Sequence, residues 1–383
     1  MSALQHLLST YQARLEAVPA QVDGRPVVVH TGADVPREVL GAAGFVPFRL
    51  SGRPGSTGTA DPYCGPGIDR VAVSRLARLL DGDADAAAGL VLSADNEGSV
   101  RLFLYLREIL RLEPRDHLPP LTFLDLLHLR QRSSAVYNRT RLDALIEDVG
   151  QWAGRPVSDA GLRAAAATQD QVRTLIRAVG TQLRSAPGGP RLTGAQALAV
   201  IGASFVSAPE RWCSTVTDLL QEAAALPVHE GTRVFLTGCD HDHTRVYDLV
   251  ESLGAIVVGE DHDWGAPAGA GSVGTAYDIR SALVRTRAQG APASAGHSAA
   301  ARAAQTVRMA LAGGADLVIA WTRPFDDAPP WDVPLQRLAL QDAGIPLVVV
   351  PAQPYGSEDN HQMRTFLEPV LRDPQRTAVA QPR

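Results

Sequence analysis

The sequence contains no lysine, and all 36 of its basic residues apart from histidine are arginine. Without a lysine amine the chain cannot form a Schiff base with a carbonyl substrate or with pyridoxal phosphate. It also cannot supply the lysine of a phosphate-binding P-loop. Several classes of enzyme are therefore excluded before any motif is considered.

Cysteines and long apolar runs are also scarce. The three cysteines, Cys64, Cys213 and Cys239, show no disulfide framework spacing, so we expect reduced thiols and a cytoplasmic protein. No stretch approaches the roughly 20 apolar residues of a membrane span, and the N-terminus lacks a signal-peptide pattern. The net charge of −5 gives no reason to expect nucleic acid or a membrane surface as a partner.

The residues that are present alternate between short apolar runs and helical spacing. Residues 234–236 predict a buried strand, residues 244–253 have one apolar helical face, and residues 255–258 predict the next strand. A similar strand–helix–strand unit covers residues 26–50. Further along the chain, a helix is expected to open at the segment around Cys64 and to run through Leu79, and another is expected at residues 334–343. The sequence therefore predicts an α/β protein with two doubly wound parallel-sheet domains of the Rossmann or flavodoxin type, joined by a helical connecting region.

Changes in pattern along the chain give the boundaries of these parts. We expect an N-terminal α/β domain at residues 1–135, the helical connecting region at 136–228, and a C-terminal α/β domain at 229–383. In a parallel sheet, ligands bind in the crevice beyond the carboxyl ends of the strands. Polar residues that directly follow predicted strands are therefore the candidates for function.

One group of such residues has the side chains of a metal site. Cys239, His241, His243 and His262 fall in two loops that should converge, and their types suit zinc or iron. Two histidines at i and i+2 in a loop are also typical of capped or solvated turns, and no His-Glu-x-x-His motif accompanies them. The sequence leaves both readings open.

Three motifs in fixed order resemble a known family. Residues 31–50 read TGADVPREVLGAAGFVPFRL, similar to a family run of Pro-x-Glu-Leu, Ala-Ala-Gly and Pro-Val. Residues 236–238 (LTG) followed by 255–261 (AIVVGED) are similar to a second signature, and 344–350 (GIPLVVV) to a closing strand. Over nearly its whole length the chain resembles the 2-hydroxyacyl-CoA dehydratase and benzoyl-CoA reductase family, and within it the D-component of 2-hydroxyglutaryl-CoA dehydratase.

The resemblance implies two sheet domains, a helical portion and subunits that pair. It implies a [4Fe–4S] cluster held between the domains by three cysteines from strand-end loops. It also implies removal of water from 2-hydroxyacyl-CoA thioesters, or reduction of aromatic thioesters, through ketyl-type radicals. A separate ATP-driven protein supplies the activating electron in that family.

The chain departs from the family at the ligand positions of the cluster. Cys64 stands at the first position, but Asn96 stands at the second and Asp326 at the third. Iron–sulfur clusters are held chiefly by thiolates, and these oxygen ligands would hold a cubane weakly. We therefore interpret Cys64 as a vestigial ligand and expect that this chain alone binds no cofactor, whereas a partner subunit could carry a [4Fe–4S] cluster.

The resemblance and the strand ends together indicate a site in the cleft between the domains. A histidine titrates near neutrality, and arginine pairs well with the phosphates of CoA. Asp and Asn are also common helix N-caps, which is the competing explanation for several of these positions. The catalytic candidates are His30, Asp326 and Glu97, and the substrate-binding candidates are Arg49, Asn96 and Arg323.

These observations favour a dehydratase-like subunit that binds an acyl thioester or a partner in the cleft, without its own cluster. The partner would be a homologous family subunit or a second copy of the chain. Two alternatives stay open: a cluster-free lyase that uses His30 with cleft carboxylates, and a non-catalytic scaffold subunit.

Overall fold

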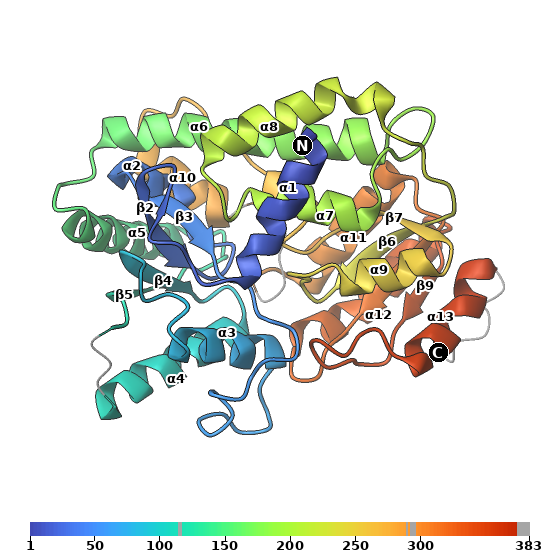
Figure 1. Ribbon diagram of the computed structural model, residues 1–383, viewed down its shortest axis with the longest axis horizontal. Coiled ribbons are helices and arrows are strands. Elements are labelled where there is room, and N and C mark those ends of the chain that lie inside the picture. The colour runs from blue at the N-terminus through green and yellow to red at the C-terminus, as the bar shows by residue number, and fades with distance from the viewer. Residues whose placement is uncertain (114–116, 289, 292–295, 374–383) are drawn as a thin grey trace.

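The computed structural model describes residues 1–113, 117–288, 290–291 and 296–373 (Figure 1). The strands are β1 (Gln21–Val22), β2 (Arg25–His30), β3 (Val46–Arg49), β4 (Gly89–Ser93), β5 (Leu121–Leu124), β6 (Thr232–Gly238), β7 (Ala255–Glu260), β8 (Leu317–Trp321) and β9 (Leu347–Val349). The α-helices are α1 (Ala3–Gln12), α2 (Arg37–Ala43), α3 (Arg70–Leu80), α4 (Glu97–Leu112), α5 (Arg132–Trp152), α6 (Asp159–Val179), α7 (Gly194–Ala203), α8 (Pro209–Gln221), α9 (Arg245–Ser252), α10 (Ile279–Ala288), α11 (Ala299–Gly313), α12 (Ala328–Asp342) and α13 (His361–Arg372).

Two parallel sheets form the centre of the molecule, which confirms the predicted fold class. In the first sheet the order is β3-β2-β4-β5, and β1 adds a short antiparallel hairpin to the start of β2. In the second the order is β7-β6-β8-β9, with every pair parallel. The chain therefore reverses its direction of winding beside β2 in one sheet and beside β6 in the other, and such switch points open a crevice at the strand ends.

Buried β-branched runs make these strands. Residues Val27, Val28 and Val29 of β2 have no exposed surface, as expected for a strand covered on both faces. The helix α2 that follows ends at Gly44, whose φ of +97° is the left-handed conformation that glycine adopts without strain. The turn returns the chain to β3, which pairs with β2 so that His30 lies opposite Arg49.

Helices cover both sheets and join them. Figure 1 shows α6 and α8 running over the top of the molecule across both halves, while α3 and α4 lie beneath the first sheet and α12 beneath the second. The helices between the sheets occupy residues 132–221, close to the connecting region expected from the sequence. The domain boundaries themselves stay a prediction. In the part of the chain that is described, no helix has the length and apolar character needed to cross a membrane.

Two helix starts differ from the prediction. The helix expected at Pro334 begins at Ala328, because Pro329 is accommodated in its first turn, where backbone N–H groups lack partners anyway; Pro334 lies inside it. The helix expected to open near Cys64 begins at Arg70, with Asp69 capping the N–H of Val71. Cys64 therefore lies in a turn ahead of the helix rather than at its start.

Candidate functional site

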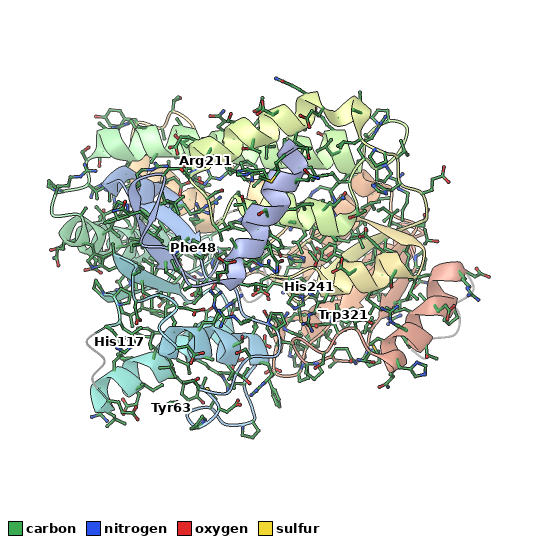
Figure 2. All side chains as sticks on the ribbon, viewed as in Figure 1. Phe48, Tyr63, His117, Arg211, His241 and Trp321 are labelled. Carbon is green, nitrogen blue, oxygen red and sulfur yellow. The ribbon has the colours of Figure 1, made fainter. Side chains whose placement is uncertain are left out.

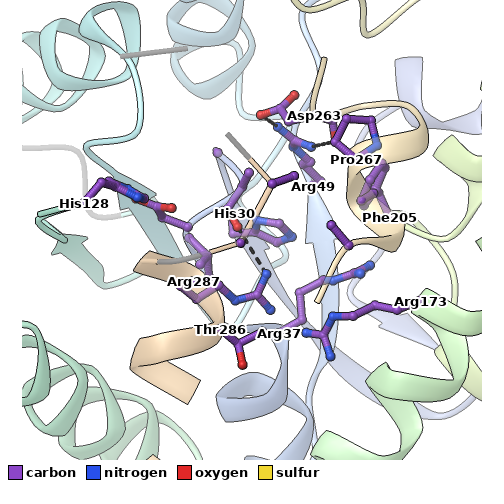
Figure 3. Close-up of a pocket in the computed structure, with 18 of the residues that line it drawn as sticks. His30, Arg37, Arg49, His128, Arg173, Phe205, Asp263, Pro267, Thr286 and Arg287 are labelled. Atoms are coloured by element: carbon purple, nitrogen blue, oxygen red, sulfur yellow. Dashed lines mark hydrogen bonds and ion pairs between the residues drawn. The ribbon is translucent and has the colours of Figure 1, made fainter. Parts of the chain in front are cut away.

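A cavity of about 90 Å³ lies beyond the carboxyl end of β2 (Figure 3). Four arginines line it, and they come from four different elements: Arg37 of α2, Arg49 of β3, Arg173 of α6 and Arg287 of α10. Loop residues 263–270, which follow β7 of the second sheet, contribute further lining. Since one buried water needs at least about 10–15 Å³ of such space, the cavity has room for a short acyl group but not for a whole CoA.

His30 is the last residue of β2 and lines this cavity with its imidazole. Its side chain is 2% exposed, and neither ring nitrogen makes a hydrogen bond of normal geometry among the described residues, although the backbone of Gly32 lies close enough to raise the pKa of the ring slightly. Burial, followed by the positive charges of Arg49 and Arg37, holds the pKa of His30 well below its ordinary value. The imidazole is therefore neutral at neutral pH, with one nitrogen able to donate and the other able to accept.

Arg37, the first residue of α2, is buried beside His30. Its guanidinium donates to the carbonyl oxygen of Ser204 at 3.2 Å and lies 5.2 Å from the centre of the Phe205 ring. No carboxylate of the described residues forms an ion pair with it. Burial, then the neighbouring Arg287 and Arg173, lower the pKa of Arg37 to about 9.

The other charges around the cavity are paired. Arg49 contacts Asp263 at 2.6 Å, and Nε2 of His128 lies 2.7 Å from Oδ2 of Asp34. Burial alone would lower the pKa of His128, but the hydrogen bond and the charge of Asp34 raise it overall. The cavity thus has a neutral histidine on one wall and a histidine that favours the protonated form on another.

Glu38 is the carboxylate beneath the cavity, and its side chain has no exposed surface. It forms ion pairs with Arg173 and with Arg287, the latter at 2.8 Å. Burial would raise the pKa of Glu38, but the charges of Arg287 and Arg173 lower it well below its ordinary value. One carboxylate therefore ties α2 to both α6 and α10.

Asp95 lies behind the cavity wall in the loop after β4. Its Oδ2 accepts from the N–H of Ala33 at 2.6 Å, and its Oδ1 lies 3.1 Å from Oγ of Ser93. Ser93 has one hydroxyl hydrogen, and the carbonyl oxygen of Thr31, 3.0 Å away, can only accept it. The short contact with Asp95 is then best satisfied by a proton on that carboxyl. Burial, with the charges of Asp34 and Asp263, raises the pKa of Asp95 to about 7.

A second charged cluster occupies the switch point of the other sheet. Arg323 follows β8 and donates to both carboxylate oxygens of Asp69, to Oδ1 at 3.3 Å and to Oδ2 at 3.0 Å. It also contacts Oδ1 of Asp240 at 2.9 Å and Oδ2 of Asp326 at 3.3 Å. Burial raises the pKa of Asp326 to about 6 in spite of Arg323. Because the guanidinium of Arg323 is saturated by protein oxygens, the cluster joins the two halves of the molecule rather than presenting a free cation.

The structure brings only some of the predicted site residues together. His30 and Arg49 line the cavity, although Arg49 is paired with Asp263. Because each follows a predicted strand end, the sequence also predicts that His30, Cys64, Asn96, His241 and Asp326 line one cleft. Of these five, His30 contributes to the lining of this cavity, and the shared cleft stays a prediction.

The remaining predicted residues have local partners that explain them. Asn96 caps α4 by accepting from the N–H of Ser99 at 2.8 Å, and Glu97, half exposed, pairs with Arg101 along the same helix. Arg323 and Asp326 belong to the interdomain cluster. The N-cap alternative thus accounts for Asn96, and Glu97 lies outside the cavity. The catalytic roles of Glu97 and Asp326 stay predictions.

The four residues considered for a metal site are all buried in the second half. His262 contacts the hydroxyl of Tyr247 at 2.8 Å, and His243 lies 3.3 Å from Glu358. Figure 2 shows His241 beside Trp321, and the centroids of the two side-chain rings are 6.3 Å apart. Across residues 1–113, 117–288, 290–291 and 296–373, no three Cys, His, Asp or Glu side chains converge as metal ligands would.

Sequence reasoning missed Arg37, Arg287 and the His128–Asp34 pair. Arg37 reads as the polar position of a short amphipathic helix, and nothing in its neighbourhood signals that it is buried without a carboxylate. His128 lies 94 residues from its partner in the chain. The proximity of His30 to the family motif at residues 31–50 was the only signal that pointed to this region.

A sequence model of the family described as "2-hydroxyglutaryl-CoA dehydratase, D-component" matches residues 33–371. The chain belongs to this family. The resemblance found in the sequence motifs is thereby confirmed. A comparison with curated proteins gave no match.

The residues of this dehydratase-family chain do not fit the cluster that the family implies. Cys213 is buried in α8 and Cys239 is buried at the end of β6, where burial raises the pKa of both thiols, that of Cys213 to about 11. Burial and the charge of Asp61 also raise the pKa of Cys64. Figure 2 shows Tyr63, the neighbour of Cys64, far from His241 at the other switch point. A cubane needs several thiolates at one point, and this donor set offers protonated thiols at separate ones.

Proposed function

We propose that the chain is a dehydratase-type subunit that binds the acyl part of a thioester in the cavity and holds no [4Fe–4S] cluster of its own. The observation that carries the proposal is the cavity at the switch point beside β2, which His30 lines with a neutral, unpartnered imidazole. A homologous partner subunit would carry out any radical step.

The positions of the side chains support this assignment. A short acyl group fits the cavity volume, so the bulky CoA would extend out of it. The ring N–H or ring nitrogen of His30 would hydrogen-bond a thioester carbonyl or a hydroxyl group of the ligand. The apolar ring of Phe205 and the methylenes of Pro267 would contact the carbon chain.

A cluster-free lyase is the second candidate, and the Asp34–His128 pair favours it. In that reaction the ligand would be a 3-hydroxyacyl thioester: His30 would remove a proton from C2, next to the thioester carbonyl, while His128 protonates the hydroxyl that leaves from C3. The C–H and C–O bonds break, a C=C bond forms and water departs. This version replaces Glu97 and Asp326 as acid–base partners with groups that line the same cavity as His30.

Binding and iron analysis test the proposal. Isothermal titration of the chain with lactoyl-CoA should give saturable binding that free CoA does not reproduce. His30→Asn should weaken binding by about tenfold, the loss of one buried hydrogen bond, whereas His361→Asn at the exposed start of α13 should not. Equal binding of free CoA and lactoyl-CoA would place the ligand elsewhere.

Iron content tests the second half of the proposal. The chain, purified anaerobically and reconstituted with iron and sulfide, should retain iron near background, and Cys64→Ser should leave that level unchanged. About four irons per chain with a broad visible absorbance, lost in Cys64→Ser, would show that this chain carries the family cluster.

Hydrodynamic mass tests the partner assignment. The chain co-expressed with a homologous subunit should purify as a complex with it, and a chain that stays a monomer in the presence of that subunit would contradict the assignment.

A further inference from the structure

We infer that Arg37 and His30 form an anion site within the cavity, and that the group which enters it is the carboxylate of a short acyl ligand. The inference rests on the proposed function for the thioester but adds the charge of the bound group. It is carried by the charges around the cavity and by the side chains that lack partners.

The charges around the cavity leave one cation unmatched. Arg49 is matched by Asp263, and the pair Arg173 and Arg287 share Glu38, with Asp170 beside Arg173. Asp34 is matched by His128. Among the described residues Arg37 alone of the four lining arginines has no carboxylate partner. The undescribed residues between Ala288 and Gly296, at 289 and 292–295, contain no acidic side chain in the sequence.

An unmatched buried cation is costly for the empty protein. Arg37 is 6% exposed, and the charges of Arg287 and Arg173 repel it, each more strongly than the charge of Glu38 attracts it. Removing a charge from water without a counter-charge is unfavourable, and the low local dielectric strengthens the repulsion. An anion in the cavity would reverse both effects, so the site favours a ligand of charge −1.

The hydrogen-bonding groups match a carboxylate. A guanidinium has five N–H donors in a planar fork, and the Ser204 carbonyl oxygen occupies Nη1 of Arg37. The remaining donors leave room for the paired oxygens of a carboxylate, which the fork binds in bidentate fashion. The unpartnered His30, 2% exposed, offers one more donor on the same cavity. Figure 3 shows His30, Arg37 and Arg287 around the same space.

Size and charge together favour carboxylate over phosphate. One unmatched arginine beside a neutral histidine balances one negative charge, whereas a phosphate dianion would leave a charge unmatched. The cavity of about 90 Å³ also leaves little room for a phosphate ester with its substituent. The ligand is therefore expected to be a short acyl group that ends in a carboxylate.

Thermal shift and titration with free acids test this inference independently of any thioester. Acetate, propionate and glycolate, in a buffer free of other carboxylates, should raise the Tm of the wild type and saturate. Acetamide, which is uncharged and of similar shape, should not, and phosphate should act weakly. Stabilisation by acetamide equal to that by acetate would mean that the cavity recognises shape alone. An equal effect of chloride or phosphate would mean that Arg37 attracts any anion.

Arg37→Met is the decisive variant because it removes the charge but keeps the length of the side chain. The empty variant should melt higher than the empty wild type, by about 2–4 °C, since an unmatched buried charge is gone. The carboxylate-dependent shift should disappear. Arg173→Met is the matched control: it lines the same cavity but is paired, so its loss should lower the Tm. A fall in the Tm of empty Arg37→Met, with the acetate shift intact, would overturn the inference.

The two proposals fail in different ways. If acetate stabilises the wild type through Arg37 but neither lactoyl-CoA nor a thioester with a terminal carboxylate binds, the anion site stands and the thioester function is wrong. If lactoyl-CoA binds equally to wild type and to Arg37→Met, and a thioester with a terminal carboxylate binds no better, the cavity does not distinguish acyl groups by charge. The inferred anion site would then be wrong, while the thioester function would stand.

Discussion

At the residue scale, the buried carboxyl group of Asp95 has a strongly raised pKa, and its surroundings explain why. Asp95 is held between the N–H of Ala33 and the hydroxyl of Ser93, at a place where its charge would face Asp34 and Asp263. Gly32 makes this close approach possible: its φ is +83°, and a Cβ there would lie 2.0 Å from Oγ of Ser93. The loop is therefore built around an uncharged Asp95.

The pH dependence of stability should report this proton. Below about pH 4 Asp95 is protonated in both folded and unfolded chains and has no effect. Because its folded pKa is raised to about 7, the folded state keeps the proton while the unfolded state loses it, so stability falls as pH rises from about 4 to 7. The loss amounts to no more than about 4 kcal/mol.

Asp95→Asn removes this titration but keeps both hydrogen bonds, since an amide accepts from Ala33 and donates to Ser93. Urea unfolding should show the variant more stable than the wild type at pH 8, with the difference shrinking toward pH 5. Asp342→Asn, at the exposed end of α12, should give no such trend. A difference that is independent of pH would show that Asp95 is charged in the fold.

At the scale of elements, the buried carboxylate of Glu38 fixes α2 against two helices distant in the sequence. Arg173 lies 135 residues and Arg287 249 residues away from it. A helix of only seven residues has little stability of its own, so these ion pairs and the apolar contacts of α2 hold it and place Arg37 at the cavity.

Glu38→Gln should therefore be strongly destabilising. The change leaves Arg173 with only Asp170, leaves Arg287 without a carboxylate, and adds to the repulsion around Arg37. We expect the free energy of unfolding to fall by about 3–5 kcal/mol, measured by urea denaturation. Glu108→Gln is the control, because Glu108 pairs with Arg111 on the exposed face of α4, and its change should leave the midpoint nearly unaltered. Similar midpoints for both variants would contradict the role given to Glu38.

At the scale of the whole molecule, buried polar contacts join the two halves. Asp242, in the loop after β6, accepts from the N–H of Gly52 at 2.7 Å and from the hydroxyl of Tyr355 at 2.8 Å. Its backbone carbonyl accepts from Tyr11 and from Arg14, both at 2.8 Å. Together with the pair of Arg323 and Asp69, these contacts make the halves interdependent.

Calorimetry should accordingly show a single unfolding transition for the wild type. Asp242→Ala removes the carboxylate that bridges the halves and leaves Arg75 with Asp240, 3.7 Å away, as its remaining ion-pair partner among the described residues. The Tm should therefore fall by roughly 5 °C or more, and the transition should broaden or split. Asp248→Ala, six positions along the chain on the exposed side of α9, should keep a single transition near the wild-type Tm. Two transitions in the wild type would mean that the interface does not couple the halves.

The sequence by itself determined the α/β class, the two doubly wound sheets, the family and the place of His30 at a strand end. These features follow from local signals, since apolar periodicity, glycine turns and contiguous motifs can be read within a few tens of residues. A proline can stand either in the first turn of a helix or inside it. The helix expected to start at Pro334 is present, but it starts at Ala328, so the predicted start was wrong.

Only the tertiary structure decided which charges are paired. Arg37, Arg49 and Arg323 are the same residue type. Arg323 pairs with Asp69, 254 residues away, and Arg49 pairs with Asp263, 214 residues away. Arg37 forms no ion pair with a carboxylate among the described residues. Burial and charge pairing depend on how distant loops dock, and that arrangement has no signature within a short window of residues. The same residue type is therefore a paired structural bridge at two positions and a buried guanidinium without a carboxylate partner among the described residues at the third.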